Sequence, residues 1–207
     1  MIQLRGYIVL DSLQPQLSAI ISNTSKGYLP VQSMTSLFLE VHPAIFIHRL
    51  LDVAIKSTAV FPSMAIVERE YGVLEVHHQE QGEVRQAGAA VLDYLQLSES
   101  CRRKPRILSS QIIRALEPYH AQIVNKESRG QNVVPGQSLF ILETVPAVYV
   151  AYAANQAEKA ARIELVDVKF CGAFGRLYLA GSESEVDSAA AAAVECLGTL
   201  DGRETKD

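Results

Sequence analysis

The sequence lacks the long apolar run that a membrane-spanning helix needs. No hydrophobic stretch approaches the roughly 20 residues that cross a bilayer, and residues 1–5 do not begin a secretory signal peptide. We therefore expect a soluble, cytoplasmic protein with no membrane partner. The 207 residues are 48% hydrophobic and 20% charged, which supplies enough apolar material for a buried core.

Cysteine is also scarce. The three cysteines, Cys101, Cys171 and Cys196, are odd in number and far apart, and none has the spacing of a CxxC motif or of a zinc site with histidine. The sequence therefore predicts neither a structural disulfide nor a metal site, as is usual in a reducing compartment.

The chain carries no excess of positive charge. With 19 basic and 23 acidic residues its net charge is −4, which argues against a nucleic-acid partner. The basic cluster Arg102, Arg103 and Lys104 lies between the two halves of the chain, where we expect a solvated linker.

No catalytic constellation is present either. His77 and His78 are adjacent on a predicted strand, so their side chains point to opposite faces and cannot share a metal ion. No serine lies in a GxSxG motif, and the glycines around Gly172 do not have the spacing of a GxGxxG loop. The other histidines have no Cys or carboxylate at ligand spacing: His42, His48 and His120. We predict a protein that is not an enzyme and binds no cofactor.

What the sequence does contain is an internal repeat. At an offset of 103 residues, glycines, prolines, a leucine, a glutamate and a lysine coincide in the two halves: Leu13 with Leu116, Pro15 with Pro118, Gly27 with Gly130, Glu40 with Glu143, Pro43 with Pro146, Lys56 with Lys159 and Gly72 with Gly175. Since glycine and proline mark backbone constraints, this pattern indicates two copies of one fold in tandem. One-residue shifts align residues 36–38 with 138–140, and Val84 with Val186.

Each half is predicted to contain strands interleaved with two helices. The expected strands cover residues 2–10, 37–41, 64–67, 72–76, 107–113, 139–143, 165–170 and 176–180. The expected helices cover residues 44–58, 81–97, 147–161 and 185–200. This pattern predicts the α/β (α+β) class, with one helix-covered sheet in each half. The expected organisation is a first domain over 1–100, a linker over 101–105, a second domain over 106–200 and a flexible tail over 201–207.

One predicted turn is charged in the first half only. Glu68, Arg69 and Glu70 form the tight connection between two strands, and their counterparts, Cys171, Gly172 and Ala173, are uncharged. A charged turn is usually just solvated. The divergence of the two turns within a shared frame favours a specific task for this loop.

Two lysines occupy the same point of the first helix of each half. Lys56 follows Asp52 by four residues, the spacing of an intrahelical ion pair, whereas Lys159 follows Asn155. Because the lysine is kept where the acidic partner is not, we expect it to act outside the helix.

Several of these segments resemble the bacterial microcompartment shell domain. The similar segments are residues 138–143, 146–147, 153–161 and 172–175 in the second half, and Glu40, 43–44, 52–56 and 71–72 in the first. In that family the strand similar to residues 107–113 closes the domain, whereas here it comes first, so both halves resemble circularly permuted shell domains of ferredoxin-like fold. The arrangement is similar to the double-stacking trimeric shell proteins of carboxysomes and other microcompartments.

The resemblance implies a homotrimer that takes the place of a hexamer, stacks as a pair of trimers, and adjoins hexameric and pentameric shell proteins in the microcompartment shell. It implies that Glu68 and Arg69 gate a central pore for small anionic metabolites. Around that pore we expect Glu68, Arg69, Glu70, Cys171, Gly172 and Ala173. At the tile edge we expect Lys56, Lys159, Asp52 and Asn155.

Two alternatives remain open at the level of sequence. Some shell trimers that this chain resembles carry an iron-sulfur cluster at the pore, and three Cys171 side chains could hold one for electron transfer. The other alternative is a small α/β signalling or enzyme domain that shares only the topology.

Overall fold

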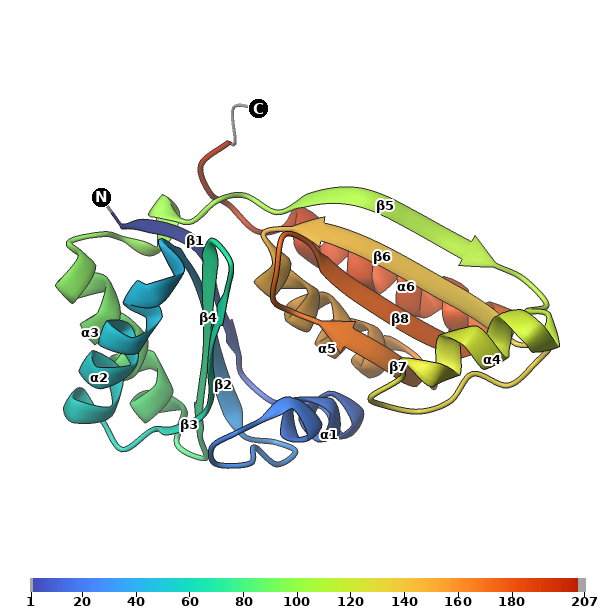
Figure 1. Ribbon diagram of the computed structural model, residues 1–207, viewed down its shortest axis with the longest axis horizontal. Helices are drawn as coiled ribbons and strands as arrows, with labels where there is room; N and C mark the ends of the chain where they lie inside the picture. Colours follow the sequence, from blue (N-terminus) through green and yellow to red (C-terminus); the bar gives the residue numbers. More distant parts are fainter. Residues whose placement is uncertain (1, 205–207) are drawn as a thin grey trace.

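The computed structural model describes residues 2–204 and contains two similar halves in tandem (Figure 1). Each half is built on a four-stranded antiparallel sheet, with the strand order β1-β2-β4-β3 in the first and β5-β6-β8-β7 in the second. The α/β class and the tandem arrangement are confirmed. Within the described residues, no helix is long and apolar enough to cross a membrane.

The elements follow the same order in both halves. The first half comprises β1 (Gln3–Leu10), α1 (Pro15–Thr24), β2 (Thr35–His42), the 3₁₀ turn η1 (Ala44–Phe46), α2 (Ile47–Ser57), β3 (Phe61–Glu68), β4 (Tyr71–His78) and α3 (Gln81–Leu95). After the turn η2 (Glu99–Cys101), the second half comprises β5 (Arg106–Ile113), α4 (Pro118–Lys126), β6 (Ser138–Val145), η3 (Ala147–Tyr149), α5 (Val150–Ala160), β7 (Glu164–Lys169), β8 (Gly175–Gly181) and α6 (Glu183–Gly198).

All eight predicted strands and four predicted helices are present, with shifted ends, but α1 and α4 were not predicted. Both are short, at 10 and 9 residues, and begin at a proline that occupies the first turn. In α4 only Ala121 is buried, so its apolar periodicity is weak. Pattern alone cannot separate such a helix from a loop.

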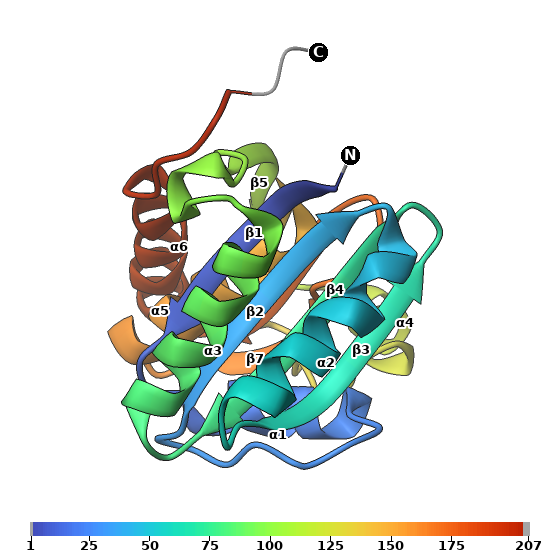
Figure 2. The same ribbon diagram turned by 90° about the vertical axis from the view of Figure 1, so that its left-hand side faces the viewer.

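Apolar side chains form one core within the first half, another that spans both halves, and a third, smaller one under α4 in the second half. Figure 2 shows α2 and α3 lying across one face of the first sheet, where Leu39, Leu50, Leu74 and Val84 form a cluster. The opposite face of that sheet packs on the second half, and Ile8, Phe38 and α1 join a cluster with residues of α5, β7 and α6. The two halves therefore share a core and are not separate units joined only by a linker.

The ladders show that the repeat offset is 103 throughout the sheets. Glu40 pairs with Val73, and Glu143 pairs with Arg176. The predicted one-residue shift that aligned residues 36–38 with 138–140 is wrong, because such a shift turns side chains to the opposite face. The shift that aligns Val84 with Val186 is confirmed, since both are buried in the first turns of α3 and α6.

The connector between the halves is not the solvated linker that the basic cluster predicted. The Arg102 side chain is buried, donates to the carbonyl oxygens of Tyr7 (3.0 Å) and Asp201 (2.8 Å), and forms an ion pair with Glu99. The backbone N–H of Arg203 also donates to the carbonyl of Arg102 at 2.8 Å. Residues 201–204 are therefore held against the connector, which corrects the predicted loose tail. The rest of that tail, 205–207, lies outside the described residues.

The first turn of α1 is capped by α5 of the other half. The Asn155 side chain accepts from the backbone N–H of Gln14 (2.9 Å) and donates to the carbonyl of Ser12 (3.1 Å). The Glu158 carboxylate accepts from the N–H groups of Gln16 (2.8 Å) and Leu17 (3.0 Å). These contacts satisfy donors that the first turn of a helix leaves unpaired.

The burial of Asn155 corrects one expectation of the sequence. Its side chain is only 1% exposed and contacts the other half of the same chain, so it cannot belong to a tile edge. An amide serves this position well because it both donates and accepts, which an aspartate cannot do.

Replacing Asn155 with alanine should lower the free energy of unfolding by about 1–2 kcal/mol, because the N–H of Gln14 and the carbonyl of Ser12, both partly buried, lose their partner. The measurement is urea denaturation at one fixed protein concentration, with the exposed Lys159→Ala on the same helix as the control. Equal stabilities of the two variants would contradict the capping role.

Candidate functional site

The β3–β4 and β7–β8 connections lie next to each other. The charged loop, defined as Glu68, Arg69 and Glu70, lines a hollow of about 400 Å³ together with Tyr71, Gly172 and Ala173. Five of the six predicted pore residues are thus brought together by the fold. Cys171 is the exception, because it packs against the core that spans both halves.

Arg69 holds an unusual backbone conformation for an arginine. Glu68 pairs with Tyr71 across the ladder, so Arg69 and Glu70 form a two-residue turn in which Arg69 has φ of +52°. This left-handed region usually favours glycine, and a non-glycine residue there costs roughly 1 kcal/mol or more. An arginine in this strained backbone conformation favours the hypothesis that the Arg69 side chain has a function.

The charges of the loop are free to interact with something outside the chain. The Arg69 side chain is 91% exposed, and its Nε lies 4.0 Å from Oε1 of Glu68. An exposed ion pair at this separation contributes little to stability. Opposite the loop, Gly172 has φ of +104°, so a glycine relieves strain there.

A buried ion pair forms the base from which the loop projects. Arg5 Nε lies 2.6 Å from Oε1 of Glu40, and the Arg5 guanidinium lies 3.7 Å from the ring centroid of Tyr71 at the start of β4. Glu40 Oε2 accepts from the backbone N–H of Val148 at 3.0 Å, in the second half. Burial raises the pKa of the Glu40 carboxyl, which Arg5 and the N–H groups of η3 oppose.

The sequence did not single out the Arg5–Glu40 pair. Two signals were available: an acidic residue within an apolar strand, and its repetition as Glu143. A charge is buried only when it is paired, so such a residue points to a partner elsewhere in the fold.

The remaining predicted edge residues lie on α2 and α5. Lys56 Nζ lies 2.7 Å from Oδ1 of Asp52, so the predicted intrahelical ion pair is confirmed. Both Lys56 and Lys159 are exposed, whereas Asn155 is not. The role of Asp52, Lys56 and Lys159 at a tile edge stays a prediction.

The other polar cluster in the first half is buried. The Ser36 hydroxyl donates to the Glu75 carboxylate, whose second oxygen lies 3.2 Å from Nδ1 of His77. All three side chains are buried, so this network supports the sheet and offers no surface to a substrate. Across the described residues, no group of three or more His, Cys, Asp and Glu side chains could hold a metal ion.

The three thiols should react with iodoacetamide in a definite order. A hydrogen bond from Ser98 lowers the pKa of Cys101, whereas burial raises the pKa of Cys171 and raises that of Cys196 to about 12. Only the thiolate reacts, so labelling of Cys101 should begin at the lowest pH and Cys196 should stay unlabelled at neutral pH. Peptide mass spectrometry across a pH series measures this order, and faster labelling of Cys196 than of Cys101 would contradict it.

Comparison with known proteins places this chain in one family. The family described as the CsoS1D N-terminal domain matches residues 4–101. The carboxysome shell protein CcmP of Synechococcus elongatus is 45% identical over 203 residues, covering 98% of this chain and 95% of that protein. The carboxysome shell protein CsoS1D of Hydrogenovibrio crunogenus is 46% identical over 201 residues, covering 97% and 98%.

Two solved structures share the whole fold. The fused permuted hexameric shell protein MSM0275 from the RMM microcompartment is 42% identical, with a TM-score of 0.94 over 97% of this chain and 99% of that one. The double ringed trimeric shell protein MSM0271 from the same kind of microcompartment is 37% identical, with a TM-score of 0.95 over 99% and 100%. The chain therefore belongs to the CsoS1D and CcmP family of bacterial microcompartment shell proteins, with two permuted shell domains in tandem.

Proposed function

We propose that three copies of this protein form a ring of six domains that serves as a structural tile in a microcompartment shell. The names of the relatives support this: two are carboxysome shell proteins, and one solved structure is described as a double ringed trimeric shell protein. By the same likeness, pairs of rings stack, and the tile adjoins other hexameric and pentameric shell proteins. The protein acts as a structural component and not as an enzyme.

The observation that carries this proposal is an unequal exposure of equivalent residues. In η3, Val148 and Tyr149 are 0% exposed because the first half covers them. Their counterparts in η1, Ile45 and Phe46, are 64% and 38% exposed. Apolar side chains that are buried at one junction and exposed at the equivalent position fit a second junction, made with another copy.

The polar contacts at the internal junction have matching groups on the free surfaces. Glu40 accepts from the N–H of Val148, and the counterparts of these two residues are Glu143 and Ile45. Glu143 is partly exposed and forms an ion pair with Arg176 at 2.7 Å. In the ring, Glu143 of each copy meets the N–H of Ile45 in the next. Repetition of one junction around an axis closes a ring of six domains from three chains.

A central pore follows from this ring. The charged loop and the Gly172–Ala173 loop alternate around the axis, so three Glu68 and three Arg69 side chains face a constriction. A ring of charges at a constriction selects ions or charged metabolites. Three arginines near an axis repel one another and are stabilised either by Glu68 or by a small anionic metabolite, which gives the loop two arrangements and makes it a gate.

At the rim of the tile, Lys56 and Lys159 contact neighbouring tiles.

Replacing Ile45 with aspartate should disrupt the ring, because the new carboxylate becomes buried without a partner. We expect the dissociation constant of the trimer to rise by about 100-fold or more, since such a burial costs several kcal/mol and each 1.4 kcal/mol is tenfold. Light scattering over a concentration series measures it. The matched control is Val31→Asp, because Val31 and its counterpart Val134 are both exposed. A wild-type monomer would sink the proposal.

Replacing Glu68 and Arg69 together with alanine should open the pore and leave the trimer intact. Both side chains are exposed, and substitutions of exposed residues usually change stability by about 0.5 kcal/mol or less. Native mass spectrometry tests the trimer, and electron cryo-microscopy compares the pore with that of the wild type. Loss of trimers in this variant, or a pore that stays closed, would refute the gate assignment.

A further inference from the structure

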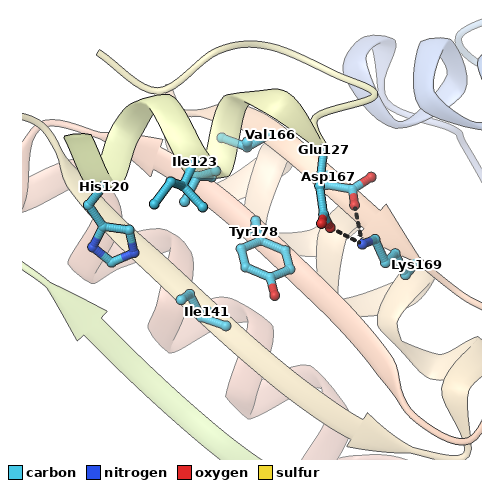
Figure 3. A pocket seen from close by; sticks show the side chains of 9 residues that line it. His120, Ile123, Glu127, Ile141, Val166, Asp167, Lys169 and Tyr178 are labelled. Carbon is cyan, nitrogen blue, oxygen red and sulfur yellow. Dashed lines mark hydrogen bonds and ion pairs between the residues drawn. The ribbon is translucent and has the colours of Figure 1, made fainter. Parts of the chain in front are cut away.

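A pocket of about 280 Å³ lies beneath α4, against the outer face of the second sheet. Figure 3 shows apolar side chains on its floor and walls, with the charged groups gathered on one side. The side chains that the argument uses are Ile123, Ile141, Asp167, Lys169 and Tyr178. Ile123 is exposed at the rim, although it is apolar.

The equivalent place in the first half is already filled. There α1 lies against the face of the first sheet that is turned to the second half, and Phe170 of the second half belongs to the same apolar cluster as α1. Its ring contacts Phe38, the counterpart of Ile141, with the centroids 5.6 Å apart. Phe170 is 1% exposed, and Ile20, the counterpart of Ile123, is 0% exposed. This filled site in the first half is the template for the unfilled pocket beneath α4.

The counterpart of Phe170 is Val67, which is 43% exposed at the end of β3. Within the proposed ring, the junction between chains repeats the junction within a chain, so Val67 of one copy approaches the α4 pocket of the next. We propose that this pocket receives Val67 of a second copy and holds the base of that copy's charged loop. This inference rests on the proposed trimer, and its test below separates the two.

The polar side of the pocket sets it apart from its template. Lys169 Nζ lies 3.0 Å from Glu127 and 3.6 Å from Asp167, and the counterparts of Asp167 and Lys169 are Met64 and Ile66. Asp167 Oδ1 is buried without a hydrogen-bond partner, with Arg129 Nε at 3.7 Å. Valine is smaller than phenylalanine, so it fills the apolar side and leaves these charges in place. An acidic residue at position 67 would instead meet the Asp167 carboxylate.

The consequence for the gate is a coupling between neighbours. Val67 directly precedes Glu68 and Arg69, so a change in the pocket of one copy alters the anchor of the next copy's loop. The loops of the three copies are thereby linked through their pockets as well as through repulsion at the axis.

Cysteine cross-linking tests the contact directly. In a protein whose three cysteines are replaced by serine, Val67→Cys and Ile141→Cys should form disulfides between chains under mild oxidation. Non-reducing electrophoresis should then show dimers and trimers, because a bond within one chain would leave a monomer. The control pairs Val67→Cys with Val134→Cys, an exposed residue outside the pocket. Light scattering of the reduced proteins reports the trimer independently.

Each outcome has a distinct meaning. Cross-linked chains with Ile141→Cys but not with Val134→Cys support the contact. A reduced trimer that forms no cross-link overturns it and leaves the shell-tile proposal standing. A protein that is monomeric when reduced overturns the tile itself.

Substitutions of Val67 alone give a second readout that does not depend on disulfide geometry. Val67→Phe copies the residue of the template and should keep the trimer. Val67→Asp should raise the trimer's dissociation constant at least tenfold, because it places a carboxylate beside Asp167. An unchanged dissociation constant for Val67→Asp would overturn the proposal.

Discussion

The buried ion pair between Arg5 and Glu40 is the interaction on which the arrangement of the two halves depends. Glu40 neutralises Arg5 and also accepts an N–H from η3 of the second half. Both charges belong to the first half, so a separation or rotation of the halves would leave the ion pair intact but would remove the charge-assisted hydrogen bond from the N–H of Val148. Through Tyr71, which stacks on Arg5, the same cluster fixes the strand that carries the charged loop. The charged loop and the junction are therefore tied to the same buried ion pair.

Duplication within one chain allowed equivalent positions to diverge in chemistry. Asn155 both donates to and accepts from the loop before α1, whereas Asp52, its counterpart, forms ion pairs with Lys56 and Arg49. Phe170 fills a core, whereas Val67 lies at the surface. In a ring of six identical domains, each position holds the same residue in every domain, so that one residue would have to serve at every junction. Two domains in a chain can give each junction its own residues while the shared frame is kept.

How far the sequence predicted this molecule depended on the range of the interactions involved. Glycine and proline repeats located both domains, because these residues report local backbone constraints, and the charged turn was found because it interrupts two clear strands. Asn155 and Arg102 were misjudged, since their partners lie about 100 residues or more away along the chain. The alignment of residues 36–38 with 138–140 failed because sequence identity carries no information on which face of a sheet a side chain occupies.

The clamp between the connector and residues 201–204 has a consequence for assembly. It ties the ends of the second half to the first, so the internal junction forms as an intramolecular event at a high effective concentration and survives dilution. Three of the six seams in the proposed ring are therefore complete as soon as each chain has folded. Only three seams between chains remain to be formed, in place of six for single-domain subunits. A cell could then keep this tile at low copy number and still obtain closed rings.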